Sequence, residues 1–262
     1  AAEACANLTE FTRRPGYVFA PIHNIQANVP PENIVALFDT DIDLAQALAT
    51  ASAAAGLAAV PPFTIEEVEE QNWVQLTQSQ FDPIRITDRL WIVPSWHDAP
   101  DADAINLVLD PGMAFGTGSH PTTRMCLEWL TETVTPGVSV LDYGCGSGIL
   151  AIAAAKLGAG EVTGVDIDEK AVATAADNAA NNGVSLHLQV SAKPLDGTFQ
   201  RVVANILTNP LKMLAPLLAA RVAPGGKLAL SGVLEAQAEE VIAAYAPFIA
   251  LKVGAALDGW VR

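Results

Sequence analysis

The sequence predicts an α/β fold, in which helices cover both faces of a parallel sheet and a smaller α+β unit precedes it. From residue 122 onward, short apolar segments alternate strictly with helical segments, which is typical of such sheets. The 262 residues leave room for one large α/β domain and one smaller module. Hydrophobic residues make up 51% of the chain, which is enough to build a sizeable core.

The helices and strands of the larger domain follow from the spacing of apolar residues and from the turn residues between segments. Strands are expected at residues 139–141, 161–165, 202–204 and 227–231. Helices are expected at residues 122–133, 149–157, 169–182, 209–222 and 236–245, with a Pro-Gly-Gly turn at 224–226. Ligands of such sheets bind outside the carboxyl ends of the strands, where the strand order reverses. A binding site is therefore expected along that edge.

The part of the chain before residue 105 carries weaker signals. We place a small α+β domain at residues 1–70, a linker at 71–104 and the larger domain at 105–262. In the small domain, residues 33–38 predict a strand and the Ala-rich residues 44–55 predict a helix. Further short strands are expected at residues 63–68, 89–93 and 106–109.

The net charge of −15 argues against nucleic acid as a partner, because nucleic-acid-binding proteins concentrate Lys and Arg. Residues 1–80 contain ten acidic and two basic side chains, a net charge of −8. This acidity suits a basic partner, although plain solubility explains it equally well. No apolar run approaches the roughly 18 residues of a membrane-spanning helix, so no membrane partner is expected. The oligomeric state stays open.

Cysteine usage indicates a reducing compartment. The three cysteines, Cys5, Cys126 and Cys145, are far apart and form no CxxC pair. A disulfide framework or a zinc site is therefore not expected, and a cytoplasmic location is. No basic segment followed by an apolar run opens the chain, so no intact signal peptide is predicted. The acidic loop at 98–103 lacks the glycine and terminal glutamate of a calcium-binding loop, so no metal site is expected.

The strongest functional signal is the segment VLDYGCGSG at residues 140–148, where an expected strand runs into a glycine-rich turn that opens a helix. Glycines allow a tight turn and a close approach of backbone to ligand. Asp166 ends the next expected strand, 22 residues after Gly144. A carboxylate at this place can accept hydrogen bonds from both hydroxyls of a ribose. The segment therefore predicts a nucleoside-containing ligand in a Rossmann-like sheet, the alternative being a tight turn without a ligand.

Two details favour S-adenosylmethionine over a nicotinamide cofactor. The glycines follow the spacing GxGxG, with Gly144 and Gly146 first, whereas dinucleotide sites prefer GxGxxG. Asp142 precedes the first glycine by two residues. S-adenosylmethionine has no pyrophosphate to place on a helix terminus, but it carries an ammonium that an acid can meet directly or through water. Asp142, Gly144, Gly146 and Asp166 are therefore predicted to bind the cofactor.

Two further segments are predicted to reach the same edge. Residues 109–123 are rich in Gly, Ser and Thr, and we expect a flap over the cofactor, with Thr123 donating to its carboxylate end. The alternative is a loop in which Ser119 or His120 caps the following helix. Asn205 falls at the carboxyl end of the fourth strand, where the transferred methyl should lie, and its amide offers both a donor and an acceptor. A helix-capping role for Asn205 is the alternative.

Five segments, in this order and at suitable spacing, resemble the PrmA family, the methyltransferases of the eleventh protein of the large ribosomal subunit. They are LDPGMAFGTGSHPTTR, VLDYGCGSGILAIAAAKLGA, GVDIDEKAV, VVANIL and APGGKLALSG. The resemblance covers roughly residues 63–262. Asp142 and Gly144 alone would fit almost any class I methyltransferase, whereas FGTGSHPTT together with VANIL is far narrower.

The resemblance implies a class I S-adenosylmethionine-dependent methyltransferase fold and a ferredoxin-like amino-terminal domain that binds the protein substrate. The cofactor contacts of the family fall on Thr123, Gly144, Asp166 and Asn205. The implied reaction is the methylation of lysine ε-amines, and of an α-amine, in a basic ribosomal protein.

No catalytic residue is assigned, because positioning alone can carry an in-line displacement. For His120 a helix cap is favoured at least as strongly as a general base. The alternatives are a class I methyltransferase of another protein lysine or of a small molecule, and a non-catalytic binding module that retains the fold. The intact Asp142, Gly144, Gly146 and Asp166 count against the latter.

Overall fold

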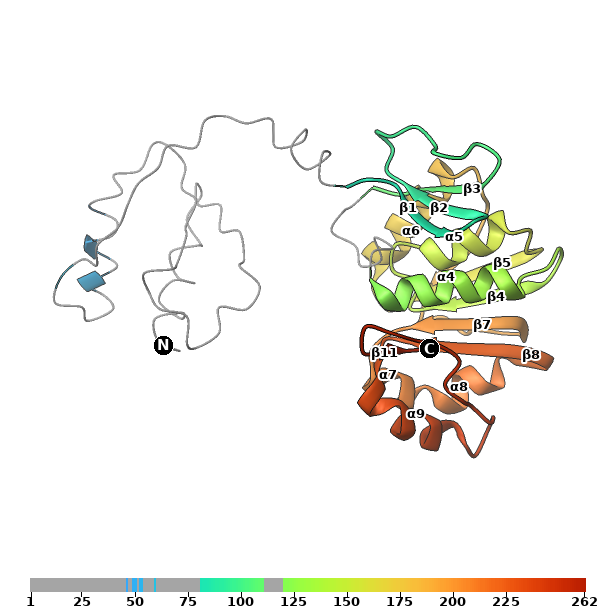
Figure 1. Cartoon of the computed structure of the whole chain (residues 1–262). Helices are drawn as coiled ribbons and strands as arrows, with labels where there is room; N and C mark the ends of the chain where they lie inside the picture. Colours follow the sequence, from blue (N-terminus) through green and yellow to red (C-terminus); the bar gives the residue numbers. More distant parts are fainter. Residues whose placement is uncertain (1–45, 47–48, 51, 54–58, 60–80, 111–119) are drawn as a thin grey trace. The chain divides into compact units, whose positions relative to one another are not determined.

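The chain divides into two compact units, Ala1–Gln71 and Asn72–Arg262. The computed structural model describes residues 81–110 and 120–262, together with residues 46, 49–50, 52–53 and 59 (Figure 1). The strands expected at 33–38 and 63–68, most of the helix expected at 44–55, and most of the predicted flap lie outside the described residues. The domain boundaries drawn from the sequence stay a prediction.

The larger unit is built on five parallel strands in the order β6-β5-β4-β7-β8. These are β4 (Ser139–Tyr143), β5 (Glu161–Asp166), β6 (His187–Val190), β7 (Phe199–Asn205) and β8 (Val222–Ser231). The first strand of this sheet in the sequence, β4, is central, and β5 and then β6 are added on one side of it. The next strand, β7, pairs with β4 on its other side, and β8 follows at that edge. The strand order therefore reverses between β4 and β7, which is where such sheets bind ligands.

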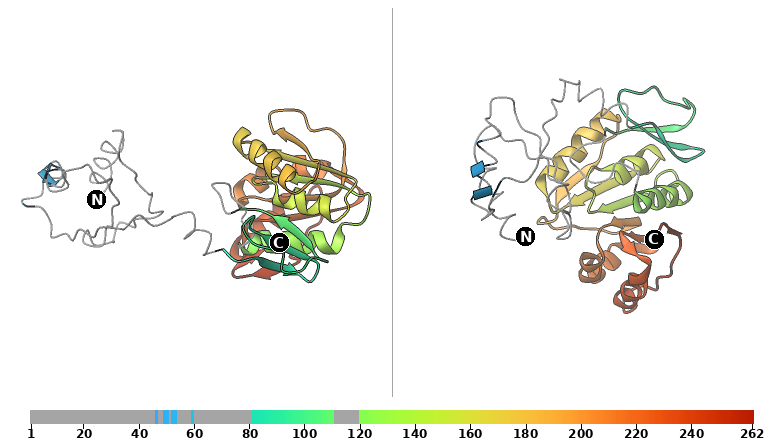
Figure 2. Two further views of the ribbon diagram at one scale, coloured as in Figure 1. Left: turned by 90° about the horizontal axis from the view of Figure 1, so that it is seen from above. Right: turned by 60° about the vertical axis from the view of Figure 1, so that its left-hand side comes forward.

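Helices cover both faces of this sheet, as the two views of Figure 2 show. They are α4 (Pro121–Thr133), α5 (Ile149–Lys156), α6 (Glu169–Asn181), α7 (Thr208–Met213), α8 (Ala215–Ala220) and α9 (Ala238–Tyr245), the last preceded by the 3-10 turn Glu235–Gln237. In Figure 1, α4 and α5 lie on one side of the sheet and α7 to α9 on the other. No helix in the described part of the chain is long and apolar enough to cross a membrane.

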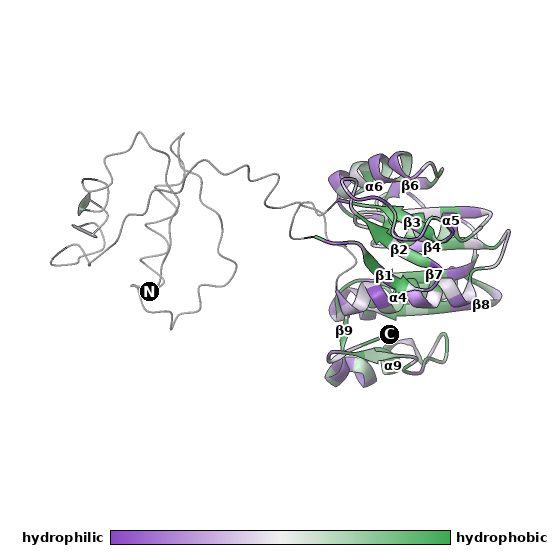
Figure 3. Ribbon diagram, turned by 45° about the horizontal axis from the view of Figure 1, so that its top comes forward, coloured by the Kyte–Doolittle hydropathy of each residue, from purple (hydrophilic) through white to green (hydrophobic). Residues whose placement is uncertain are grey.

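Successive side chains of the central strands pack into two separate hydrophobic cores, one on each face of the sheet. Val140 of β4 and Val203 of β7 pack with the helices α4 and α5. Leu141 and Val202, which are the sequence neighbours of Val140 and Val203, pack with α7, α8 and α9. This division follows from the strand period, because successive side chains point to opposite faces. Val202, Val203 and Ala204 of β7 are all buried, as expected of a strand covered on both faces, and in Figure 3 the hydrophobic colour is concentrated on the central strands of the unit.

Two small sheets flank the main one. In the first, β1 (Ile84–Thr87) runs antiparallel to β2 (Leu90–Val93), which pairs in parallel with β3 (Ile105–Val108). Its Ile86 and Leu90 belong to the core under α4 and α5, so β1 and β2 pack on the larger unit. In the second, β11 (Trp260–Val261) pairs antiparallel with both β10 (Ala256–Leu257) and β9 (Val233–Leu234).

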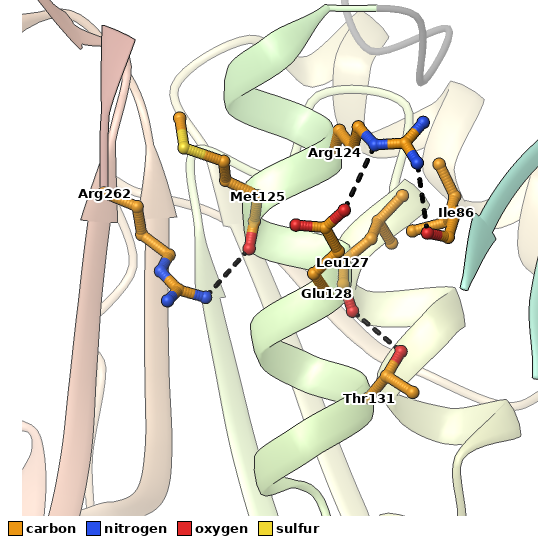
Figure 4. A network of polar contacts seen from close by, with 7 residues as sticks. All are labelled: Ile86, Arg124, Met125, Leu127, Glu128, Thr131 and Arg262. Carbon is orange, nitrogen blue, oxygen red and sulfur yellow. Dashed lines mark hydrogen bonds and ion pairs between the residues drawn. The ribbon is translucent and has the colours of Figure 1, made fainter. Parts of the chain in front are cut away.

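Two arginines tie α4 to its neighbours on either side (Figure 4). Arg124 pairs with Glu128 one turn along the helix at 3.1 Å and donates to the Ile86 carbonyl of β1 at 3.3 Å. Arg262 donates to the Met125 carbonyl at 3.0 Å from the opposite side. The helix that carries Thr123 is therefore held between the first small sheet and the β10–β11 hairpin.

Most of the elements expected in the larger domain are confirmed within a residue or two, and two expectations are wrong. The helix expected at 209–222 is interrupted at Leu214, between α7 and α8. Pro216 lies in the first turn of α8 and has no N–H for the preceding turn, which favours a new helix start. The turn expected at 224–226 lies within β8, whose pairing with β7 is irregular at this place.

Asn182 joins two layers of the unit that are far apart in sequence. Its carboxamide oxygen accepts from the Val108 N–H at 2.8 Å, and its amide donates to the Val108 carbonyl at 2.7 Å. The same amide also donates to the Asn178 carbonyl at 2.8 Å. The side chain is buried, so the carboxamide acts as a backbone partner that β3 would otherwise lack.

We therefore expect Asn182→Ala to lower the free energy of unfolding by about 3 kcal/mol, because the Val108 N–H and carbonyl lose their buried partner. The neighbouring Asn181 is exposed, and Asn181→Ala should change stability by less than about 0.5 kcal/mol. Urea unfolding followed by tryptophan fluorescence measures both. Equal losses in the two variants would show that the carboxamide does not join β3 to α6.

Candidate active site

The residues predicted from the sequence gather at the carboxyl ends of the parallel strands. Asp142 lies near the end of β4, Asp166 ends β5 and Asn205 ends β7. The glycine-rich turn leaves β4 and opens α5. Because β4 and β7 are neighbours across the point where the strand order reverses, these groups share one edge of the sheet.

The glycine-rich turn is held against the next strand by backbone hydrogen bonds. The N–H groups of Gly144 and Cys145 both donate to the Val165 carbonyl, at 2.7 and 3.0 Å. Gly144 has φ of +79°, and a Cβ built on it would collide with Cγ2 of Ile206. A side chain is thus excluded here by backbone conformation and by space. The turn consequently presents backbone rather than side chains toward the edge of the sheet.

Asp166 is fixed by two backbone donors, one on each carboxylate oxygen. Oδ2 accepts from the Gly146 N–H at 2.9 Å, and Oδ1 accepts from the Asp168 N–H at 3.0 Å. The first bond joins the end of β5 to the glycine-rich turn. A carboxylate has about four lone-pair sites, so two remain for a ligand. Since Asp166 is half-buried, those sites can be reached from solvent.

Asp142 lies in a different electrostatic environment. Its side chain is completely buried, and its one hydrogen bond to the described residues is the one that Oδ2 accepts from the Ala151 N–H at 3.1 Å. Oδ1 has no partner among the described residues. Burial raises the pKa of this carboxyl to about 7, the Ala151 N–H opposes the rise, and the negative charge of Asp166 adds to it. Among the described residues, the Ala151 N–H is thus the one group that donates to this carboxyl.

Thr123 and Asn205, which are 82 residues apart in sequence, lie in contact. The Asn205 amide Nδ2 donates to Oγ1 of Thr123 at 3.3 Å. Thr123 is buried in the first turn of α4. The contact directs the Asn205 amide toward α4 and leaves its oxygen as an acceptor, while the threonine hydroxyl keeps a proton to donate. Both predicted residues thus face one place at the end of β7.

His120 caps α4, as the sequence allowed. The Thr122 N–H donates to its Nδ1 at 3.3 Å, and the Thr122 hydroxyl lies 2.7 Å from the same nitrogen. The imidazole and the Trp260 ring of β11 pack in a T-shaped arrangement, with ring centroids 4.9 Å apart. Capping occupies Nδ1 of His120, so these contacts support a capping role rather than that of a general base. Pro121 occupies the first turn, also as expected.

Sequence reasoning missed Ile206 and Gly232, which hold the end of β7 in place. The Ile206 N–H donates to the Ser231 carbonyl at 3.2 Å. Gly232 has φ of +84°, and a Cβ there would collide with the Ile206 carbonyl group, its carbon at 2.8 Å. The segment LSG at residues 230–232 contained the signal, because a glycine directly after a strand often marks a close backbone approach.

The thiols of the described cysteines are not reactive groups. Cys126 and Cys145 are free and buried. Burial raises the pKa of Cys126 to about 12 and also raises the pKa of Cys145, and in both cases the charge of Asp142 adds to the effect. Neither thiol is therefore a nucleophile near neutral pH.

Comparison with known proteins gives one family. The family model described as "Ribosomal protein L11 methyltransferase (PrmA)" matches residues 13–262. The ribosomal protein L11 methyltransferase of Dechloromonas aromatica is 61% identical over 228 residues, which are 87% of this chain and 77% of that protein. That of Thiobacillus denitrificans is 58% identical over 237 residues, 90% of this chain and 80% of that protein.

A solved structure agrees with the sequence comparison. The crystal structure of the ribosomal protein L11 methylase from Lactobacillus delbrueckii subsp. bulgaricus matches with a TM-score of 0.64 and 34% sequence identity. The match covers 69% of this chain and 96% of that one. Fold and sequence thus point to the same group of proteins.

The burial of Asp142 predicts a pH dependence of stability. Its pKa rises from 3.8 to about 7 on folding, so the native state binds this proton more tightly than the unfolded state. The stability that Asp142 contributes is fully present below the unfolded pKa and is lost as pH rises through about 7. Relative to Asp142→Asn, the ligand-free wild type should lose on the order of 1–4 kcal/mol between about pH 5 and about pH 8.

Urea unfolding at several pH values measures this difference. Asp177→Asn, which neutralises an exposed carboxylate on α6, is the control and should give a difference that hardly varies with pH. A pH-independent difference between wild type and Asp142→Asn would contradict the prediction.

Proposed function

The chain belongs to the ribosomal protein L11 methyltransferase (PrmA) family, and from that premise we propose that it transfers methyl groups from S-adenosylmethionine to lysine ε-amines, and to an α-amine, of ribosomal protein L11. The observation that carries this proposal is the family match over residues 13–262, which spans the whole predicted cofactor site. It favours L11 over the alternatives of another protein lysine or a small molecule. No contact among the described residues of the candidate active site favours the alternative of a binding module that keeps the fold without catalysis.

The residues at the strand ends fit S-adenosylmethionine. The buried, unpartnered Oδ1 of Asp142 is available to the cofactor's ammonium, directly or through water. Gly144 and Gly146 would offer backbone at a place where a Cβ on Gly144 would collide with Ile206. Asp166 would accept from the ribose hydroxyls with its remaining lone pairs, and Thr123 would donate to the carboxylate end. When bound, the cofactor supplies an electrophilic methyl group on a sulfonium.

Asn205 is proposed to orient the substrate amine. Its Nδ2 donates to Thr123, so its Oδ1 is the atom that faces an incoming amine as an acceptor. A hydrogen bond from the amine to this oxygen would turn the nitrogen lone pair toward the methyl group. A free lysine has a pKa of about 10.4, and desolvation at the site would lower it so that the neutral, nucleophilic form is reached. Positioning and desolvation would then supply the rate enhancement without a general base.

The amino-terminal residues are proposed to bind the protein substrate. Residues 1–80 carry a net charge of −8, while the proposed cofactor contacts begin at Thr123. A basic ribosomal protein would be attracted to such a region over distances of about a Debye length. This division of labour agrees with the separation of the chain into the units Ala1–Gln71 and Asn72–Arg262.

Asp166→Asn tests the cofactor assignment. The substitution keeps the shape of the side chain and removes the charge that strengthens its hydrogen bonds to the ribose, so affinity for S-adenosylhomocysteine should fall about tenfold or more. Asp177→Asn makes the same charge change at an exposed position of α6 and should leave affinity unchanged. Isothermal titration calorimetry measures both, and circular dichroism checks the fold. An unaltered affinity in Asp166→Asn would reject the assignment.

Intact-mass analysis of ribosomal protein L11 tests the activity and the role of the amino-terminal unit together. After incubation with the 262-residue chain and S-adenosylmethionine, the mass of L11 should rise in methyl increments. A chain that lacks residues 1–71 should keep its cofactor affinity within about twofold, because it retains every proposed contact, but should methylate L11 at least about tenfold more slowly. Full-rate methylation by the truncated chain would show that the acidic bias serves only solubility.

A further inference from the structure

An exposed leucine lies beside the proposed methyl-transfer site. Leu207 follows Asn205 by two residues and stands between β7 and α7, with 69% of its surface exposed. A scattered exposed leucine is ordinary on a protein surface. This one lies two residues after Asn205, the residue proposed to orient the substrate amine. Its exposure therefore raises the question of what covers it when substrate is bound.

Leu207 also breaks a local rule of helix formation. It is the N-cap residue of α7, a position that favours Ser, Thr, Asp or Asn because their oxygens accept from the first free N–H groups. Leucine makes no such bond, and its backbone (φ −62°, ψ 153°) already has the extended conformation that a capping serine adopts. The next residue, Thr208, uses its hydroxyl on Gln237 at 2.8 Å instead. Local departures without a folding gain are concentrated at functional sites.

The backbone around Leu207 is fixed, which a specificity role requires. Ile206 is bonded to the Ser231 carbonyl and packed between Gly144 and Gly232. The Leu207 carbonyl accepts from the Leu211 N–H at 3.1 Å, and Thr208 is buried. The leucine thus projects from a segment that is held on both sides, at a set distance along the chain from Asn205.

We propose that Leu207 is a specificity-determining residue that packs on the methylene stem of the substrate lysine and places its ε-amine at Asn205. The inference rests on the proposed function and identifies the lysine stem as the part of the substrate that Leu207 contacts. A lysine stem is four methylenes long and apolar, and a leucine is a suitable surface for it. Contact with a leucine also removes water from the stem close to the amine, which favours the neutral form needed for attack.

Leu207→Ser separates this role from a structural one, because the two make opposite predictions. A serine N-cap should raise the urea midpoint of unfolding, while the loss of apolar contact should lower kcat/KM for L11 by about tenfold or more. Affinity for S-adenosylhomocysteine should not change. Leu207→Met, which keeps an apolar side chain of similar size, should retain most of the kcat/KM of the wild type.

Met213→Ser is the matched control. Met213 ends α7, is 81% exposed, and loses a comparable apolar side chain without lying next to Asn205 in sequence. Its kcat/KM for L11 should stay within about twofold of the wild type. An unchanged kcat/KM in Leu207→Ser, or a loss accompanied by weaker cofactor affinity and a lower urea midpoint, would overturn the inference alone. Failure of the wild type to methylate L11 would overturn the proposed function as well.

Discussion

The close approach of Ile206 to two glycines is the constraint on which the rest of the site depends. Its side chain excludes a Cβ at Gly144, and its carbonyl excludes one at Gly232. Three segments, which follow β4, β7 and β8, can therefore meet only where two of them have no side chain. This contact also fixes Asn205, because the next residue, Ile206, donates its N–H to the Ser231 carbonyl. The contact with Thr123 then brings α4 to the same place.

Two carboxylates on adjacent strands meet opposite surroundings at this edge. Asp166 has a backbone N–H on each oxygen and remains half-buried. Asp142 is completely buried with one donor, and burial raises its pKa to about 7. An uncompensated buried acid is costly in the free protein and is stabilised by a cation that arrives with a ligand. The asymmetry suits a cofactor with a neutral ribose near one acid and an ammonium near the other.

The sequence was most informative where a pattern is local. The glycine-rich turn, the acid at the end of β5 and the capped start of α4 each follow from residue types at short spacing, and the helices follow from apolar periodicity. Long-range pairs were not predictable in this way. Thr123 and Asn205 were each assigned to the same edge, but their contact was not predicted, and the pairing of Asn182 with Val108 had no signal in the sequence. Strand β6, with one exposed and three half-buried residues at the edge of the sheet, lacks the apolar run that reveals its neighbours.

The pairing of Asn182 also bears on how the molecule ages chemically. Asn182 is followed by Gly183, and Asn-Gly is the dipeptide most prone to spontaneous deamidation. In that reaction the glycine nitrogen attacks the asparagine side-chain carbonyl and forms a succinimide. Here the carboxamide is committed to both backbone groups of Val108 and to the Asn178 carbonyl, and the Gly183 N–H is bonded to the Ala180 carbonyl at 3.0 Å. The attacking Gly183 nitrogen and the Asn182 carboxamide that it would attack are therefore both engaged in other hydrogen bonds. The contact that joins β3 to α6 thus also protects the folded chain from an irreversible covalent change.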